Sequence, residues 1–208
     1  MSEESIMLPV FNIVRHRIST DGAGVVTLVG AFGCPLACKY CINPHAWKAE
    51  NKHKCKLMTP TELYDAVKID DLYFQATNGG ITFGGGEALL HTQFIAEFKK
   101  LIKENWHINV ETSLHVSQKQ LEQVLSSVDD FIVDIKDCNP NIYEAYTSQP
   151  MGNVLSNLEI VLRTKGPEHV WVRVPHIPNY NTDEDVKHSI EVLKNMGITQ
   201  IEEFNYIT

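Results

Sequence analysis

The sequence predicts an α/β fold built on a parallel sheet. Continuous β-branched runs, such as residues 25–30, are typical of parallel strands that are buried on both faces. Most of these runs are followed by an amphipathic segment with helix-capping residues, and strands that alternate with helices indicate a parallel sheet. Six strand–helix units are expected, which are too few for a closed eight-stranded barrel. A chain of 208 residues is expected to form a single domain, residues 1–208.

The strands are predicted from their apolar patterns. An extended segment at 10–14 leads to a turn at 19–24, where Gly22 and Gly24 are free to take positive φ. The six core strands are expected at residues 25–30, 81–83, 108–111, 131–135, 170–174 and 198–201. The connections between them are expected to be right-handed crossovers.

The helices are predicted from apolar spacing and from end signals. Thr59-Pro60-Thr61-Glu62 has the spacing of a capping box with proline at the first helical position, and predicts a helix through about Lys68. Thr182 begins another capped helix, which ends near Gly197. Further amphipathic helices are expected around residues 94–102, 121–125 and 154–162.

Composition excludes several functional classes. The formal net charge of −8 argues against nucleic acid as the main partner. No apolar run is long enough to span a bilayer, and Met1-Ser2-Glu3-Glu4 lacks the basic start of a signal peptide. A reducing, cytoplasmic location is therefore expected, which would suit an oxygen-sensitive group working under anaerobic conditions.

Three of the five cysteines lie within eight residues, directly after the first core strand: Cys34, Cys38 and Cys41. Clustered thiolates in a reducing compartment favour zinc or an iron–sulfur cluster over disulfides. The spacing is not the paired C-x2-C of a four-thiolate zinc site. A cubane cluster takes four thiolates, so three would leave one iron open to another ligand. The alternative is a non-catalytic zinc-binding module that uses the three cysteines with His45 or Cys55.

The two remaining cysteines, Cys55 and Cys138, are interpreted as non-ligands, because two are too few for a second cubane cluster. Cys55 lies inside a basic run that contains Lys48, Lys52, Lys54 and Lys56. This run is either a solvated loop or a docking patch for an acidic electron donor.

Glycines and charged residues follow the predicted core strands. They are Gly85-Gly86-Glu87 after the second strand, Glu111 and Thr112 at the third, Asp134 and Lys136 at the fourth, and Arg173 in the fifth. Glycines let a backbone approach a ligand closely. Buried charges are costly unless they are paired or bound to a ligand. The residues alone leave both readings open, structural ion pairs or a ligand site.

The order Cys34-x3-Cys38-x-Tyr40-Cys41 resembles the signature of the radical S-adenosylmethionine (SAM) superfamily. The resemblance implies an open six-stranded (β/α)6 partial TIM barrel with a [4Fe-4S] cluster on the three cysteines. It also implies that SAM chelates the open iron. Reductive cleavage of SAM would then give a 5′-deoxyadenosyl radical that abstracts a hydrogen atom.

The same resemblance implies roles for the residues at the strand ends. Gly85-Gly86-Glu87 resembles the motif whose backbone and acid hold the ammonium group of SAM. Tyr40 would lie beside the adenine, and Lys136 would pair with the SAM carboxylate. The remaining residues assigned to SAM are Glu111, Thr112, Asp134 and Arg173, of which Glu111 and Asp134 would bind the ribose, the ammonium or a small monovalent cation.

The match narrows to the glycyl-radical-enzyme activating enzymes, typified by pyruvate formate-lyase activase. The chain is similar to them over about residues 15–206, including Asp21-Gly22-Ala23-Gly24, Asn43 and Val170-Trp171-Val172-Arg173-Val174-Pro175. The resemblance implies a monomeric oxidoreductase of the single-cluster type. Its substrate would be a glycyl radical enzyme, and its electron donor a flavodoxin or ferredoxin. Asp21 would lie on the side where the glycine-bearing loop enters.

The sequence departs from that family at Glu111-Thr112-Ser113-Leu114, where the family often has Asp-Thr-Asn-Gly. This departure leaves a second hypothesis open. In it the radical chemistry is the same, but the substrate is a ribosomal peptide or a small metabolite.

Overall fold

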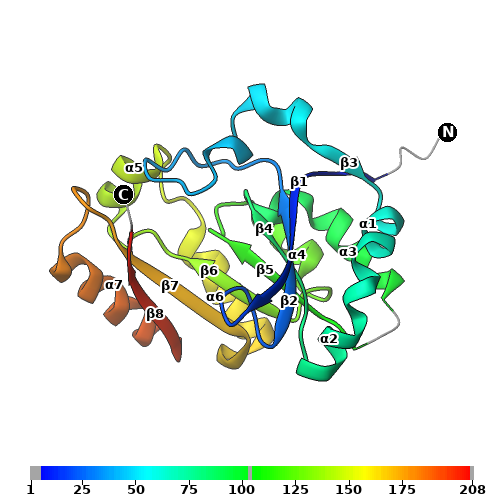
Figure 1. Cartoon of the computed structure of the whole chain (residues 1–208). Coiled ribbons are helices and arrows are strands. Elements are labelled where there is room, and N and C mark those ends of the chain that lie inside the picture. Colours follow the sequence, from blue (N-terminus) through cyan, green and yellow to red (C-terminus); the bar gives the residue numbers. More distant parts are fainter. Residues whose placement is uncertain (1–5, 103–104, 207–208) are drawn as a thin grey trace.

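The computed structural model describes residues 6–102 and 105–206, whose strands form one curved eight-stranded sheet (Figure 1). The strands are β1 Leu8–Ile18, β2 Val25–Ala31, β3 Lys56–Met58, β4 Gly80–Gly85, β5 His107–Thr112, β6 Asp130–Asp134, β7 Val170–His176 and β8 Gln200–Asn205. Their order across the sheet is β3-β1-β2-β4-β5-β6-β7-β8.

Six neighbouring strands, β2 and β4 to β8, pair in parallel and in the order of the sequence. This confirms the predicted α/β class and the open sheet of six parallel strands. Because each crossover advances one position in the same direction, the sheet curls toward a barrel, and the connecting helices α3, α4, α6 and α7 lie on its outer side (Figure 1).

Two further strands extend the sheet beyond the prediction. The segment expected at 10–14 is part of the longer β1, which pairs antiparallel with β2. The short turn at 19–24 joins β1 to β2, and a short connection permits only an antiparallel neighbour. β3 pairs antiparallel with the start of β1, so that part of the basic run is a sheet edge rather than a loop.

The helices are α1 Pro60–Val67, α2 Asp71–Thr77, α3 Thr92–Leu101, α4 Gln118–Val124, α5 Pro140–Thr147, α6 Val154–Lys165 and α7 Asp183–Asn195, with short 3-10 turns η1 Pro44–Ala46, η2 Ala49–Lys54, η3 Lys68–Asp70, η4 Ala88–His91 and η5 Pro167–His169. The capping boxes predicted at Thr59 and Thr182 are both formed. α2 and α5 were not predicted, although Asn139 and Pro140 give α5 an N-cap and a proline in its first turn.

The two faces of the sheet carry different kinds of buried side chain. On the outer side, Phe83 of β4 packs against Phe98 of α3, with ring centroids 5.5 Å apart. The preceding residue of β4, Thr82, is fully buried and accepts a hydrogen bond from Asn109 Nδ2 at 3.2 Å. Because side chains alternate along a strand, the concave face thus carries a polar layer. This layer lies below the carboxyl ends of the strands, where the predicted site residues lie.

Candidate active site

The three motif cysteines lie on the irregular segment 32–43, called here the cysteine loop, which follows the carboxyl end of β2. Backbone hydrogen bonds hold this loop at two points. Gly33 N donates to Ala46 O at 2.7 Å, and Ala37 N donates to Thr147 O at 2.9 Å. The loop is therefore fixed between η1 on one side and the end of α5 on the other.

The thiols of the cysteine loop lie in surroundings that disfavour a bare thiolate. Burial, the Glu87 carboxylate and the two other thiols raise the pKa of Cys34 to about 12. Burial also raises the pKa of Cys38, while the nearby Lys136 ammonium opposes the shift. Because cysteine binds metal as the thiolate, occupation of this loop by a metal group would be coupled to loss of protons.

The cysteine loop fits an iron–sulfur cluster better than a single ion. A hollow of about 440 Å³ adjoins Cys38 and Cys41 and is bordered by Pro44 and Trp47. Within residues 6–102 and 105–206, no three His, Cys, Asp or Glu side chains converge on one ion position. A cubane gives each cysteine an iron of its own, so it does not require the thiols to converge. The three thiolates thus match the donor set of a [4Fe-4S] cluster with one open iron.

The other candidate ligands have different surroundings. His45 packs edge-on against Phe11, with ring centroids 5.2 Å apart. Cys55 lies with Sγ 3.9 Å from Asn51 O at the end of η2. Cys138 is buried, and its amide nitrogen donates to Ser189 Oγ at 3.0 Å. The described part of the chain therefore does not contain the four-ligand arrangement that the zinc alternative requires.

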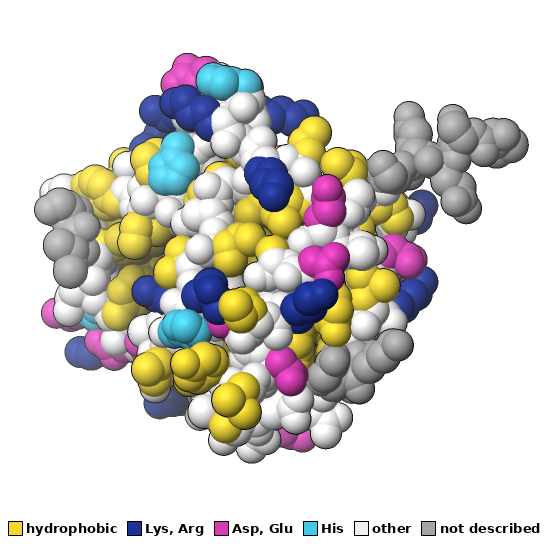
Figure 2. All heavy atoms as spheres, turned by 45° about the vertical axis from the view of Figure 1, so that its right-hand side comes forward, with side chains coloured by type: hydrophobic (Ala, Val, Ile, Leu, Met, Phe, Trp, Pro, Cys, Tyr) yellow, Lys and Arg dark blue, Asp and Glu magenta, His cyan; other side chains and the backbone are white. Residues whose placement is uncertain are grey.

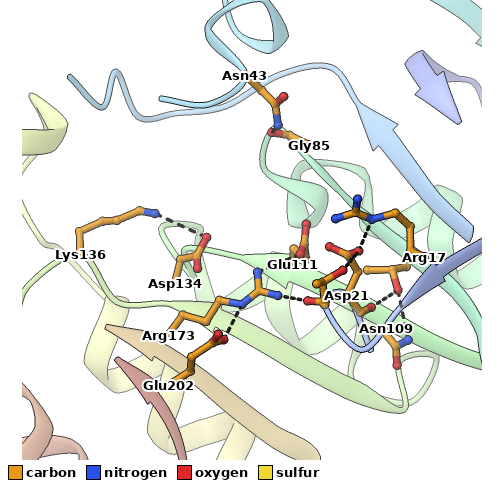
Figure 3. Close-up of polar contacts among 12 residues, drawn as sticks. Arg17, Asp21, Asn43, Gly85, Asn109, Glu111, Asp134, Lys136, Arg173 and Glu202 are labelled. Atoms are coloured by element: carbon orange, nitrogen blue, oxygen red, sulfur yellow. Dashed lines mark hydrogen bonds and ion pairs between the residues drawn. The ribbon is translucent and has the colours of Figure 1, made fainter. Parts of the chain in front are cut away.

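The Gly85-Gly86-Glu87 segment is joined directly to the cysteine loop. Gly86 N donates to Ala31 O at 3.0 Å, and Glu87 N donates to Gly33 O at 2.7 Å. A Cβ atom at position 86 would overlap Gly33 O, so this approach requires glycine. Asn43 Nδ2 donates to Gly85 O at 3.1 Å (Figure 3). The two predicted motifs, far apart in sequence, thus form one structural unit.

The Glu87 carboxylate is buried and accepts four hydrogen bonds from the chain itself. Oε1 accepts from Thr112 Oγ1 at 2.6 Å and from Leu89 N at 3.1 Å. Oε2 accepts from Ser113 N at 2.9 Å and from Ser113 Oγ at 2.6 Å. Glu87 and Thr112, both predicted to contact SAM, therefore contact each other. Their side chains support the end of β5, which leaves the glycine backbone as the part of this motif available to a ligand.

Arg173 joins the carboxyl ends of the strands to the turn at 19–24. Its Nη1 donates to Glu111 Oε1 at 2.9 Å, and its Nη2 donates to Thr20 O (Figure 3). Its Nε lies 3.5 Å from Glu202 Oε2. One guanidinium thus links β5, β7, β8 and the turn that precedes β2.

Glu111 is the acid with the most perturbed surroundings in this network. Burial raises its pKa to about 7, and the neighbouring carboxylates Asp134 and Asp21 add to the shift, while Arg173 opposes it. A carboxyl group with a pKa of about 7 carries a proton in a large fraction of molecules at neutral pH. The Glu111–Arg173 pair is therefore not a fixed ion pair.

Asp21, the predicted substrate-side residue, is only 5% exposed. It accepts hydrogen bonds from Arg17 Nε and Thr20 Oγ1, each at 2.6 Å. Burial pushes its pKa up, but these hydrogen bonds outweigh burial and lower the pKa. Gly22, next to it, has φ +138° and lies so close to Asn109 that a side chain would overlap the amide. The turn is thus seated on the polar layer of the concave face with Asp21 ionised.

Asp134 and Lys136 form an ion pair beside the cysteine loop, with Asp134 Oδ2 and Lys136 Nζ 3.5 Å apart (Figure 3). The Lys136 side chain is 10% exposed. Burial alone would lower the pKa of its ammonium, but Asp134 and other nearby groups hold the pKa well above its ordinary value. Lys136 therefore stays charged. The two carboxylates expected to share a small cation, Glu111 and Asp134, each face a cationic side chain, and that cation site stays a prediction.

Tyr40 belongs to a cluster of tyrosine rings beside the cysteine loop. Its ring centroid lies 6.2 Å from that of Tyr146 and 5.9 Å from that of Tyr180. Its hydroxyl accepts a hydrogen bond from Asn179 Nδ2 at 3.2 Å. Tyr206, after β8, completes the tyrosine cluster, with its ring 6.1 Å from Tyr146.

The structure brings the predicted residues of the cysteine loop and of the strand ends together at the carboxyl edge of the sheet. Sequence reasoning missed Arg17, Thr20 and Tyr206. Tyr206 directly follows the last strand, so the strand-end argument applied to Glu111 and Asp134 could have found it. The turn between β1 and β2 was predicted at 19–24, but the contact of Arg17 with Asp21 also depends on how far β1 extends, which the sequence pattern did not show.

Comparisons with known proteins agree with this site. The model of the radical SAM superfamily matches residues 28–193. The (2S)-3-sulfopropanediol dehydratase activating enzyme of Klebsiella oxytoca is 28% identical, over 84% of this chain and 73% of that enzyme. The pyruvate formate-lyase-activating enzyme of Clostridium pasteurianum is 30% identical, over 90% of this chain and 78% of that enzyme.

Among solved structures, Streptococcus suis SuiB bound to S-adenosylmethionine has a TM-score of 0.66. The sequences are 10% identical, and the match covers 88% of this chain and 40% of SuiB, which supports the likeness of fold alone. In the described part of this chain, no helix has the length and apolarity to cross a membrane.

The superfamily match covers well over half of the chain and contains the cysteine loop, the Gly85-Gly86-Glu87 segment, Lys136 and Arg173. The protein is accordingly an oxidoreductase with a [4Fe-4S] cluster and SAM as its cofactors. The chain belongs to the radical SAM superfamily.

Proposed function

We propose that the protein is an activating enzyme that abstracts a hydrogen atom from a backbone glycine of a partner glycyl radical enzyme. The observation that carries the proposal is the single unit formed by the cysteine loop and the Gly85-Gly86-Glu87 segment, in a chain similar to two such activating enzymes over most of its length. When bound, the cluster and SAM supply an electron and a 5′-deoxyadenosyl radical.

The side chains position SAM in this proposal. The Gly85–Gly86 backbone would face its ammonium group, and the buried Lys136 ammonium would face its carboxylate. Tyr40 would lie beside the adenine. Glu111, Asp134 and Arg173 would line the ribose and methionine side, beside the Glu87 and Thr112 side chains, which are joined by their own hydrogen bond. None of these groups needs to act as a general base, since their work is orientation and exclusion of water.

Asp21 and its turn form the substrate side of the site. The turn is hydrogen-bonded to Arg173, which also binds Glu111. A peptide that contacts the turn would therefore be separated from the SAM-binding residues by no more than the Arg173 side chain. We expect Asp21→Asn to lower the yield of glycyl radical per 5′-deoxyadenosine formed, because SAM cleavage would no longer be matched to a correctly placed glycine. Unchanged coupling in the variant would remove Asp21 from this role.

The experiment that tests the activity uses anaerobically reconstituted protein with SAM, a reductant and a candidate partner. Pyruvate formate-lyase and sulfopropanediol dehydratase are the first candidates, because the relatives are named for activating them. We expect the electron paramagnetic resonance signal of a glycyl radical with one partner of this class. Formation of 5′-deoxyadenosine without a glycyl radical on any such partner would sink the proposal and favour a ribosomal peptide or a metabolite as substrate.

A flavodoxin- or ferredoxin-type protein is proposed as the electron donor, docking on the basic segment beside the cysteine loop. Basic side chains, drawn in dark blue, gather at the top of the view in Figure 2, over the segment that contains η1 and η2, where they are lysines. Lys48, Lys52 and Lys54 are exposed there, and an acidic donor would be steered to them.

The docking proposal predicts a slower encounter when these charges are reversed. Glu in place of Lys48, Lys52 and Lys54 should slow reduction of the cluster by flavodoxin about tenfold or more at low salt. Reduction by dithionite should be unchanged. The control of equal charge is Glu in place of Lys119, Lys187 and Lys194, which are exposed on α4 and α7 at the outer side of the sheet. An equal loss in the control would mean that net charge, rather than this segment, sets the rate.

We further propose that the protein is a monomer with a single domain and that it is located in the cytoplasm.

A further inference from the structure

Lys136 is a buried cation whose hydrogen bonding is incomplete. An ammonium group has three donors. Within the part of the chain that the structure describes, Nζ donates to Tyr206 Oη at 3.3 Å and lies 3.5 Å from Asp134 Oδ2. A buried charge is costly unless its donors are satisfied, so the remaining capacity of Lys136 suits an anionic group of a ligand.

Tyr206 reaches Lys136 from the residue just after β8, 70 residues later in the sequence. Its backbone nitrogen donates to His176 O at 3.2 Å, which extends the β7–β8 pairing by one residue. Its ring packs against Tyr146 and Phe204, with centroids 6.1 and 5.5 Å away. The phenol is thus held by its backbone on one side and by two aromatic rings on the other.

The two partners of Lys136 differ in chemistry. The Asp134 carboxyl group competes with any ligand carboxylate for the ammonium. A phenol hydroxyl, such as that of Tyr206, accepts a hydrogen bond without cancelling the charge of the donor. It therefore orients the ammonium and leaves its charge for a ligand.

We propose that Tyr206 is a positioning residue for SAM binding, which acts by fixing Lys136 beside Cys38. Lys39 N, in the cysteine loop, donates to Tyr146 O at 3.2 Å, and the Tyr146 ring packs against the Tyr206 ring, so the Lys136–Tyr206 contact lies beside the cysteine loop. The hydroxyl of Tyr206 keeps it there, on the side where the SAM carboxylate is proposed to lie. This inference rests on the cofactors of the superfamily and is independent of which protein or peptide is the substrate.

The test is the affinity of the reduced holoenzyme for SAM, measured by the change of the cluster's electron paramagnetic resonance spectrum as SAM is added. Tyr206→Phe keeps the ring and removes the hydroxyl, and should raise the Kd for SAM about tenfold, as expected for a hydrogen bond to a charged group. Tyr180→Phe is the matched control. Tyr180 belongs to the same tyrosine cluster, and its described contacts are with the rings of Tyr40 and Tyr146. The control should leave the Kd unchanged.

A double-mutant cycle separates positioning from a general loss of packing. If Tyr206 acts through Lys136, Tyr206→Phe should change the Kd about tenfold in the native background and hardly at all in a Lys136→Met background. An equal loss in both backgrounds would overturn the proposal and assign Tyr206 a structural role. A native Kd in the single variant Tyr206→Phe would overturn it as well.

Discussion

Buried charged groups are paired to different extents at the two ends of the parallel sheet. Near the amino ends, the carboxylate of Asp70 is fully buried and accepts hydrogen bonds from Arg15 Nε at 2.8 Å and Thr27 Oγ1 at 2.9 Å. His16 Nε2 lies 3.0 Å from the same carboxylate. Burial pushes the pKa of Asp70 up, but these partners outweigh burial and lower it.

At the carboxyl ends the pairing is uneven. The Glu87 carboxylate is fully hydrogen-bonded, whereas Glu111 has a pKa raised to about 7, the Lys136 ammonium has an unused donor, and the pKa of Cys34 is raised to about 12. Native proteins satisfy their buried charges where only stability is at stake. The incomplete pairing at one end therefore marks the groups that a ligand would complete, and the complete pairing at the other marks structural groups. This division agrees with the usual place of sites in barrels of parallel strands.

The largest effect should come from removing one thiol at the carboxyl end. We expect Cys41→Ala to lose cluster iron and to reduce 5′-deoxyadenosine formation to background, because two thiolates cannot hold the cluster as three do. The matched control is Cys55→Ala, on the same side of the molecule but at the end of η2, which should retain both. Iron analysis and product chromatography after anaerobic purification are the measurements. Equal iron loss in the control would contradict the assignment of the cysteine loop.

The contribution of Glu111 to stability should change with pH, and its sign should be opposite to that of Asp70 at the amino end. Its folded pKa of about 7 lies above the ordinary value of 4.5, so the folded protein binds the proton more tightly than the unfolded chain. Its contribution to stability is therefore greatest below pH 4.5 and falls as pH rises toward 7 and above. The shift corresponds to about 3 kcal/mol.

Urea unfolding of the SAM-free protein and of Glu111→Gln across this range measures the effect. The unfolding free energy of the native protein, relative to that of the variant, should fall by about 3 kcal/mol as pH rises from 4.5 to 7.5. A difference that stays constant with pH would show that Glu111 is an ordinary ionised partner of Arg173, like the acids at the amino end.

Asp70 should show the opposite sign. Its pKa is lowered, so its contribution to stability is present above the ordinary pKa of 3.8 and is lost as pH falls below it. Asp70→Asn leaves the partly exposed Arg15 without its buried partner and should cost about 2 kcal/mol at neutral pH. Urea unfolding at pH 7 measures this loss. SAM affinity should be native, and a loss of SAM binding as large as that of a carboxyl-end variant would erase the contrast between the two ends.

The residues at the carboxyl end were predictable from the sequence, because they depend on local patterns, whereas the buried Asp70 at the amino end was not predicted. Continuous apolar runs gave six parallel strands, and the ends of those strands gave Glu111, Asp134 and Lys136. The cysteine spacing and the glycine segment were read as separate motifs, and parallel pairing of β2 with β4 brought them together.

The remaining features depend on distances that sequence patterns do not encode. The engagement of Glu87 by Thr112 and Ser113 follows from the register of β4 and β5 and from the turn after β5, where Leu114 has φ +56°. The Lys136–Tyr206 contact joins two strand ends that are separated by a whole helix–strand repeat and more. Both contacts exist only once the strands have paired.

The smallest effect is expected at the outermost charges of the amino end. Asp130, the first residue of β6, lies 2.8 Å from His169 Nδ1 and 3.2 Å from His107 Nδ1. All three side chains are between 28% and 42% exposed, so water screens their interaction and can replace it. Asp130→Asn should therefore change the unfolding free energy by less than about 1 kcal/mol and leave cluster iron and SAM affinity native. A larger loss, or any loss of iron, would mean that surface charges at the amino end reach the site through the strands. In that case the two ends of the sheet could no longer be treated as independent.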